Sequence, residues 1–335
     1  MFLKLRQALP LLAALGMIPP ASAADHVKVG SQKTPSPIYI AIDRGYFAAE
    51  GIEVEQVFFE AGQPVAVATA SGSVDFGIAG LTGGLYALCE QGALKIIGGQ
   101  NREVPGFRSN VAAASNKAWD AGLRSFKDLP GHSVAITQIG SSFHYDLALL
   151  AAKYGFDLAS IKLMPLQSNP NAVSAVVGGS ADAAITVVSY ALPSLEKGDA
   201  KLLGYIGDET PWQLVAIFAA TATANERPDT VRRFLAAFRR GARDFHDAFT
   251  GPDGKRADQA TAPAVLDLLA KDLGMPARQV SAGIGYIDPE LRIDVADIDR
   301  QVAWYKGQNL VKGALSGAEL IDLRYALPLE RKAGS

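Results

Sequence analysis

Apolar and polar positions along the first two hundred residues alternate between short strand-like runs and longer runs with helical spacing. Residues 26–30 and 53–59 have the pattern of strands, and residues 38–50 between them have the pattern of a helix. Strands that alternate with helices predict an open α/β sheet. Ligands of such sheets bind in loops beyond the carboxyl ends of the strands, so we expect functional residues in those loops.

The alternation occurs twice, and one stretch of sequence nearly repeats. Residues 72–78 and 179–185 share the frame Gly-Ser-x-Asp-x-x-Ile, and each stretch follows an Ala- and Val-rich helix and opens a short strand. Strand-like runs at 110–114 and 214–219 bracket the second unit and are interpreted as crossings between two similar lobes. We therefore predict lobe 1 from residues 24–111, lobe 2 from 112–213, and completion of lobe 1 with C-terminal helices from 214–335, with a hinge between the lobes.

After the second crossing the pattern becomes helical. Arg227-Pro228-Asp229 is typical of a helix start, and an apolar stripe follows it: Val231, Phe234, Leu235, Phe238, Ala242, Phe245 and Phe249. The opposite face carries Arg232, Arg233, Arg239, Arg240 and Arg243. A solvated helix face is favoured over a nucleic-acid or membrane patch.

The first 23 residues have the pattern of an export signal. Lys4 and Arg6 precede an apolar core at residues 9–18, and Ala21-Ser22-Ala23 follows it. That core is about half of the roughly 20 residues that a spanning helix needs, so a retained anchor is disfavoured. We predict cleavage after Ala23 and a mature protein in the periplasm.

Charge and reactive residues exclude several classes of function. The 32 basic and 34 acidic residues give a formal net charge of −2, which argues against nucleic acid as a partner. The single cysteine, Cys89, lies in an apolar run where a buried, inert thiol is expected. The four histidines show no metal-ligand spacing, and neither a nucleophile elbow nor a phosphate-binding P-loop is present. We predict no metal, no cofactor and no catalytic residue.

Short motifs follow one another in a fixed order along residues 27–203. They are Val29-Gly30-Ser31-Gln32-Lys33, Pro37-Ile38-Tyr39-Ile40-Ala41, Gly45-Tyr46-Phe47, Glu50-Gly51-Ile52-Glu53-Val54, Ala61-Gly62, the two Gly-Ser-x-Asp frames, Asp128-Leu129-Pro130-Gly131-His132-Ser133-Val134-Ala135 and Gly140-Ser141-Ser142-Phe143-His144. Together they resemble periplasmic binding proteins for aliphatic sulfonates, taurine and nitrate, a group related to thiamine-pyrimidine synthases. The resemblance implies a type II periplasmic binding fold, in which each lobe is a doubly wound sheet flanked by helices and a small anionic ligand binds between the lobes. It also implies a monomer that delivers its ligand to an ABC permease and its ATPase on other chains.

Gly140-Ser141-Ser142 ends an expected strand and begins a helix. Free N–H groups, the positive end of the helix dipole and two hydroxyls can meet an oxyanion there, although ordinary N-capping is the alternative. With the resemblance, ligand contact is predicted for these residues and for others in equivalent loops, where turn chemistry is the alternative for the polar side chains. The further candidates are Gln32, Pro37, Gly62, Gln63, Leu81, Thr82, His144, Asn169, Val188, Ser189 and Trp212.

The candidate loops limit the chemistry of the ligand. They contain no carboxylate that could pair with an ammonium group, and sulfonate-binding relatives often carry an acidic residue in place of Leu81, so taurine is disfavoured. They contain no arginine, and Lys33 is the one cation close by, which disfavours nitrate. Tyr39, Phe143, His144, Tyr190 and Trp212 could form walls for an apolar body, with core packing as the alternative for each. We expect an alkyl or aryl sulfonate or an aromatic carboxylate.

Three other functions stay open at the level of sequence. A periplasmic hydrolase could use His144 as a base beside Ser141 or Ser142, but the orienting partner that a nucleophile needs cannot be named. A protein that binds or makes the thiamine pyrimidine shares the resemblance, although a signal sequence and one cysteine do not match the cytosolic enzyme. A sensor subunit could use the same binding lobes.

Overall fold

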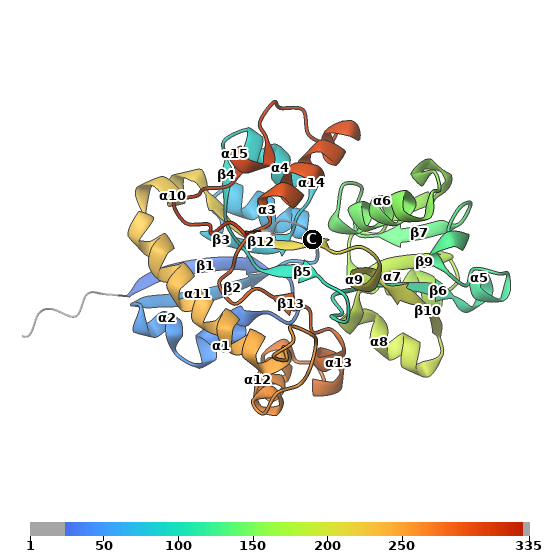
Figure 1. The fold of residues 1–335 in the computed structure, drawn as a ribbon, viewed down its shortest axis with the longest axis horizontal. Helices are drawn as coiled ribbons and strands as arrows, with labels where there is room; N and C mark the ends of the chain where they lie inside the picture. The colour runs from blue at the N-terminus through green and yellow to red at the C-terminus, as the bar shows by residue number, and fades with distance from the viewer. Residues whose placement is uncertain (1–23, 331–335) are drawn as a thin grey trace, which may run out of the picture.

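The computed structural model describes residues 24–330, so the predicted signal and its cleavage site lie outside the described residues. Two five-stranded mixed sheets, each flanked by helices, form two lobes (Figure 1). In lobe 1 the strand order is β2 (Ile52–Phe58), β1 (Asp25–Ser31), β3 (Phe76–Gly80), β12 (Val215–Ala220) and β4 (Leu94–Gly99). In lobe 2 it is β8 (Lys162–Pro165), β7 (Ser133–Ile136), β9 (Ala183–Val187), β6 (Asn110–Ser115) and β10 (Ala200–Tyr205).

The two sheets follow the same plan. In lobe 1, β1 is parallel to β2 and β3, and β12 is antiparallel to β3 and β4. In lobe 2, β7 is parallel to β8 and β9, and β6 is antiparallel to β9 and β10. The antiparallel strand of each sheet is the first strand after the chain enters that lobe from the other one. The predicted pair of similar lobes is therefore confirmed.

The repeated aspartate has the same task in both lobes. The Asp75 carboxylate accepts the backbone N–H of Lys28 at 2.8 Å, and the Asp182 carboxylate accepts that of Ser133 at 2.8 Å. Lys28 lies on β1 and Ser133 on β7, which are equivalent strands. The repeat thus joins the loop before β3 to β1 in lobe 1 and the loop before β9 to β7 in lobe 2.

A small third sheet connects the lobes. It contains β11 (Trp212–Gln213), β5 (Asn101–Glu103) and β13 (Tyr286–Ile287), with β5 in the middle. The chain leaves lobe 1 through β5 and returns through β11, so both crossings pass through this sheet (Figure 1). The predicted crossing strands β6 and β12 follow directly and enter the two large sheets.

Helices cover both large sheets, and the C-terminal segment packs on lobe 1 (Figure 1). Those before the second crossing are α1 (Pro37–Asp43), α2 (Tyr46–Ala49), α3 (Gly62–Ala70), α4 (Gly83–Glu90), α5 (Asn116–Asp120), α6 (Ser142–Tyr154), α7 (Asn169–Val177), α8 (Val188–Lys197) and α9 (Ile206–Glu209). Those after it are α10 (Thr221–Glu226), α11 (Pro228–Phe249), α12 (Ala262–Leu273), α13 (Ala277–Ala282), α14 (Val295–Gly307) and α15 (Gly317–Leu320). Within residues 24–330, no helix has the length and apolarity that crossing a membrane requires.

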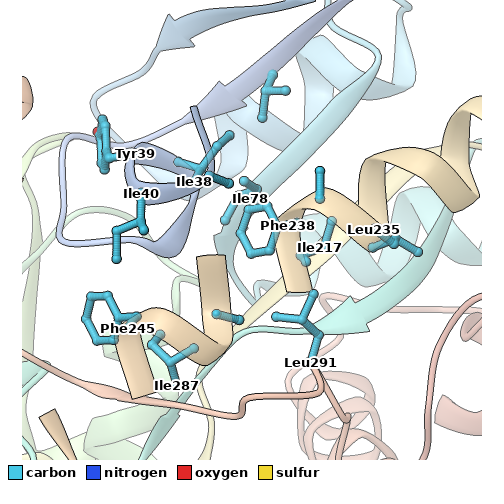
Figure 2. Packing of buried hydrophobic residues seen from close by; sticks show 14 of the residues in the cluster. Ile38, Tyr39, Ile40, Ile78, Ile217, Leu235, Phe238, Phe245, Ile287 and Leu291 are labelled. Atoms are coloured by element: carbon cyan, nitrogen blue, oxygen red, sulfur yellow. The ribbon is translucent and has the colours of Figure 1, made fainter. Parts of the chain in front are cut away.

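Helix α11 is the centre of the lobe 1 core. All seven residues of the predicted stripe are buried in one cluster with residues of α1, α12 and the first sheet. Figure 2 shows three of them, Leu235, Phe238 and Phe245, in this cluster. The helix begins with Pro228 at its first position, where the missing N–H has no cost because no intrahelical partner exists. The predicted helix and its apolar face are confirmed.

The arginine face of α11 is satisfied within the chain. Arg233 pairs with Asp25 and Asp229, and Arg239 and Arg243 pair with Glu290. The two remaining arginines lie over aromatic rings, Arg240 over Tyr46 and Arg232 over Tyr325. These contacts agree with the interpretation of a solvated helix face.

Cys89, near the end of α4, is fully buried in a second apolar cluster. Burial raises the pKa of its thiol to about 12, so the reactive thiolate is absent at neutral pH. The prediction of a buried, inert thiol is confirmed.

Candidate binding cavity between the lobes

A cavity of about 60 Å³ lies between the two lobes. It is bordered by the carboxyl ends of β1, β3 and β9, the start of α6 and the segments that cross between the lobes. Its lining residues are Ser31, Gln32, Thr34, Pro35, Ser36, Ile78, Ala79, Gly80, Gln100, Asn101, Ser109, Asn110, Ser142, Phe143, Val187, Leu214, Val215 and Gly283. Strand ends of both sheets meet here, as expected for an α/β architecture.

The cavity is small. Because one water needs about 10–15 Å³ by this measure, the space of about 60 Å³ holds only a few water-sized groups. Contacts between the lobes keep it closed: Gly83 N–H donates to the Gly140 carbonyl at 2.9 Å, and the Tyr190 hydroxyl donates to the Lys33 carbonyl at 3.2 Å. An organic ligand can therefore enter only when the lobes separate or the lining side chains move.

Two buried polar groups in the cavity lack a hydrogen-bond partner. Both residues are buried: Ser31 is 4% exposed and Gln100 is 3% exposed. Neither the Ser31 hydroxyl oxygen nor Gln100 Oε1 has a partner among the described residues. A buried polar atom without a partner costs about 1–3 kcal/mol; an anionic oxygen could relieve that cost by accepting the Ser31 hydroxyl, whereas Gln100 Oε1 would need a donor.

The start of α6 adds donors to the same wall. The Ser141 hydroxyl caps the helix by accepting the backbone N–H of His144 at 3.3 Å. The N–H groups of Ser142 and Phe143, in the first turn, have no intrahelical acceptor, and the positive end of the dipole lies beside them. The Ser142 side chain approaches β3 closely: a Cβ atom on Gly80 would lie 3.0 Å from its Oγ. The absence of a side chain at Gly80 makes this contact between the lobes possible.

The electrostatic character of the cavity comes from dipoles. None of the described residues that line it carries a formal charge. The Lys33 ammonium group, which the sequence places nearby, lies 5.1 Å from the centre of the Phe58 ring. Ile78, Phe143 and Leu214 contribute apolar surface to the same lining. The site therefore combines neutral hydrogen-bond donors with apolar surface.

His144 is held as a neutral ring outside the lining. Its Nδ1 accepts the backbone N–H of Gly140 at 3.2 Å, which assigns the proton to Nε2. Burial lowers the pKa of the ring. The ring packs edge-on against Trp304, with 5.1 Å between the ring centres. This histidine positions the loop before α6.

The structure brings Gln32 and Ser142, two of the residues predicted from sequence, to the cavity wall. The others border the cavity loops or pack behind them in this closed arrangement. Pro37 begins α1, Gly62 begins α3, Leu81 and Val188 are buried in apolar clusters, and Gly140 precedes the α6 cap at Ser141.

Four further candidates have internal hydrogen bonds. Thr82 caps α4 and donates its hydroxyl to Gln63 Oε1 at 2.9 Å. Asn169 Oδ1 accepts the Thr186 hydroxyl at 2.9 Å, and Trp212 Nε1 donates to Asp146 at 2.9 Å. The last candidate, Ser189, is buried with its hydroxyl unpartnered, close to the cavity residue Gly283. Ligand contact at these positions stays a prediction.

Sequence reasoning missed the polar residues of the crossing segments. Gln100 precedes β5 and Asn101 begins it, Ser109 precedes β6 and Asn110 begins it, and all four line the cavity. A signal was available for Ser109 and Asn110, because they adjoin or begin the crossing predicted at residues 110–114, whereas Gln100 and Asn101 lie outside it. Gly283, which follows α13 in the C-terminal segment, has no comparable signal in the sequence.

A comparison with known protein families identifies the family of this chain. The family described as NMT1/THI5 like matches residues 32–248, which is more than half of the sequence. The chain belongs to this family. A Bacillus subtilis (strain 168) protein named for the binding of aliphatic sulfonates is 27% identical over 217 residues. That match covers 63% of this chain and 63% of the relative, so the chain spans less than two thirds of the relative's length.

Solved structures of other proteins share the two-lobed architecture. An alkanesulfonate-binding protein of Xanthomonas axonopodis pv. citri, bound to MOPS, matches with a TM-score of 0.71 and 21% identity, over 90% of this chain and 99% of its own. A periplasmic nitrate-binding protein of Synechocystis PCC 6803 matches with a TM-score of 0.66 and 13% identity, over 89% and 85%. These similarities confirm the predicted type II periplasmic binding fold for this member of the family.

Proposed function

We propose that the protein is the periplasmic substrate-binding component of an ABC importer and that it holds a small organic anion between its lobes. The observation that carries the proposal is the interlobe cavity, whose lining combines the unpartnered Ser31 hydroxyl and the N-terminus of α6 with apolar residues. A sulfonate or carboxylate can accept bonds from the donors while its hydrocarbon part contacts the wall. The sulfonate- and nitrate-binding names of its relatives support an anion.

The lining narrows the class of anion. No described carboxylate lines the cavity, so a ligand with an ammonium group, such as taurine, would bury that charge without a partner. Nitrate would leave the wall of Ile78, Phe143 and Leu214 without contact. An alkyl or aryl sulfonate or an aromatic carboxylate satisfies both parts of the cavity.

Ligand binding would favour the closed form. Ser31 and Gln100 come from lobe 1 and its crossing, whereas Ser142 comes from lobe 2, so one ligand can contact both lobes only when they are together. A ligand shifts such an equilibrium by its difference in affinity for the two forms. A permease that recognises the closed form would then accept only the loaded protein.

An enzyme of the same fold is the less favoured function. No cysteine or histidine is among the described residues that line the cavity, and Nδ1 of His144 already accepts a backbone hydrogen bond. Ser142 therefore has no base within its wall that could activate it as a nucleophile. Recognition without covalent chemistry is the function that these groups support.

Thermal unfolding against a panel of compounds tests the proposal. The panel contains alkyl and aryl sulfonates, aromatic and aliphatic carboxylates, taurine, nitrate and thiamine-pyrimidine precursors. A ligand at about 100 times its Kd stabilises the native state by about 2.7 kcal/mol, so a sulfonate or aromatic carboxylate should raise Tm. A rise with taurine or nitrate alone would contradict the ligand class, and no rise at all together with ester or amide turnover would favour the enzyme.

Two neighbouring serines allow a sharper test. Ser142→Ala removes a hydroxyl that lines the cavity, and we expect ligand affinity to weaken by about 1–3 kcal/mol because a hydrogen bond to a charged group is lost. Ser141→Ala is the matched control, since its hydroxyl caps α6. The control should lower the free energy of unfolding by about 0.5–2 kcal/mol and leave affinity nearly unchanged. Calorimetric titration with the compound that raises Tm measures the affinity of both variants, and urea denaturation measures their free energy of unfolding. Equal affinity in Ser142→Ala and the unsubstituted protein would assign the anion to backbone N–H groups or another loop.

A further inference from the structure

Two carboxyl groups from different parts of the chain are buried together where the lobes join. Glu103 ends β5 in the connecting sheet, and Asp146 lies on α6 of lobe 2; both side chains are fully buried. Asn110 at the start of β6 bonds to both, its backbone N–H donating to Glu103 Oε1 at 3.0 Å and its Nδ2 to Asp146 Oδ2 at 2.8 Å. Asn110 also lines the ligand cavity, so a single residue connects the carboxyl pair to the cavity wall.

The pair has no cation among its described hydrogen-bond and ion-pair partners. Asp146 Oδ1 accepts Trp212 Nε1 at 2.9 Å, and Glu103 Oε2 has no partner, although Gly207 of α9 packs against it. The ionisable groups that face the pair are Asp208 on α9, Tyr145 on α6 and Tyr305 on α14. Arg102, the neighbouring residue on β5, has its guanidinium 3.9 Å from Asp294. Two adjacent carboxylates without a cation cannot both be charged at low cost in a buried site.

We propose that Glu103 and Asp146 hold a proton at the lobe junction and that this proton makes closure of the lobes, and with it ligand affinity, stronger at acidic than at alkaline pH. The effect on affinity rests on the proposed binding function, whereas the effect on the unliganded protein does not. Closure matters because α14 of lobe 1 contacts α6 of lobe 2 beside the pair: the Tyr305 hydroxyl donates to the Ser141 carbonyl at 3.2 Å, and Tyr305 also faces Asp146. Separation of these parts would admit water to the pair and allow both groups to ionise.

The direction of the pH effect follows from the direction in which burial shifts the pKa values of the two carboxyl groups. Burial raises the pKa of Asp146 to about 7, and burial together with the charge of Asp146 raises the pKa of Glu103 well above its usual range. A raised folded-state pKa favours the protonated form, so this stabilisation is complete below the unfolded value of about 4 and is lost as pH rises through about 7 and above. His144 acts in the opposite direction: burial lowers its pKa, so its contribution is lost as pH falls below the usual range for histidine.

The first experiment measures Tm of the unliganded protein between about pH 5 and pH 8.5, which spans the usual histidine pKa and the raised carboxyl values. Subtracting the profile of Glu103→Gln or Asp146→Asn from that of the unsubstituted protein removes the contribution of His144. We expect Tm of the unsubstituted protein to fall with rising pH relative to both variants. Glu209→Gln is the control, because Glu209 is a carboxyl on the neighbouring α9 with a lowered pKa, and its substitution should leave the slope in this range unchanged. Parallel profiles for the unsubstituted protein and the two variants would overturn the proposal.

A spectroscopic measurement covers the case in which a variant does not fold. Infrared difference spectra of the unsubstituted protein between acidic and alkaline pH should show loss of a protonated-carboxyl C=O band in a water-excluded site. The band should be absent or altered in whichever of Glu103→Gln and Asp146→Asn folds. Absence of such a band in the unsubstituted protein at acidic pH would overturn the proposal.

The second experiment measures binding of the panel compound that raises Tm most, by calorimetry in buffers of different ionisation enthalpy. We expect net proton uptake at pH 7 to 8 in the unsubstituted protein, less in Glu103→Gln, and an affinity that falls by up to about tenfold per pH unit. Binding without proton uptake would overturn the coupling to closure. If no panel compound binds, the proposed function fails, while the unliganded profiles still decide whether the pair holds a proton.

Discussion

Gly80→Val is expected to weaken ligand binding by about 1–3 kcal/mol, or roughly 5- to 150-fold in Kd, with a folded protein as the product. A Cβ atom at this position would lie 3.0 Å from Ser142 Oγ and 3.3 Å from Ser142 Cβ, and the two valine methyl groups would reach further. Gly80 belongs to lobe 1 and Ser142 to lobe 2, so the added atoms would hold the lobes apart. The backbone itself tolerates the change, because Gly80 is not among the glycines with positive φ.

The control for Gly80→Val is Gly307→Val at the end of α14. A Cβ atom on Gly307 would meet nothing within 4 Å, and Gly307 is also not among the glycines with positive φ. Calorimetric titration with the compound that raises Tm should show full affinity for Gly307→Val and weakened affinity for Gly80→Val. Equal affinities would mean that ligand binding does not need the approach of α6 to β3, and the cavity would lose its place as the binding site.

Phe238→Ala should lower the free energy of unfolding by about 3–5 kcal/mol. The Phe238 side chain is fully buried at the centre of the α11 stripe (Figure 2). Its ring centre lies 6.0 Å from that of Phe234. Removing the ring leaves a cavity between α11 and the first sheet that its close-packed neighbours can fill only in part. Because domains are stable by only about 5–15 kcal/mol, a loss of this size is readily measured by urea denaturation.

Phe58→Ala is the matched control for the ring removal. The Phe58 side chain is 41% exposed at the end of β2, and the Lys33 ammonium group lies 5.1 Å from the centre of its ring. Exposed cation–π contacts are worth about 0.5–1 kcal/mol, so the control should cost about that much or less. Similar losses in the two variants would show that α11 is not central to the stability of lobe 1.

Local patterns in the sequence were sufficient for the elements and for the plan of the fold. The stripe from Val231 to Phe249 has the 3.6-residue period of a helix with one buried face, and the structure buries that face. The repeated aspartates Asp75 and Asp182 mark equivalent loops, and the structure gives both the same bond to the equivalent strands β1 and β7. These features follow from sequence because each depends on neighbours along the chain or on a repeated arrangement.

The candidate site was predicted only in part, because capping and ligand contact use the same residue types. Ser141 and Ser142 are adjacent serines at one strand-to-helix junction; the structure directs the first to the helix N–H groups and places the second in the cavity wall. Thr82 and Asn169, also at strand ends, are engaged in hydrogen bonds within their own lobes. Residue type locates such a loop, but the direction of each side chain depends on packing from elsewhere in the chain.

The sequence alone therefore determined the class of fold, the two similar lobes, the buried helix α11 and the loops where function is expected, since periodicity and turn chemistry act over short distances. The tertiary structure decided which polar groups stand without partners, as with Ser31 and Gln100, because satisfaction depends on atoms from both lobes. It also decided the meeting of Glu103 with Asp146, which no spacing in the sequence indicates. Both features arise only where the crossing segments bring the two lobes together, and burial there sets the energy of every polar group.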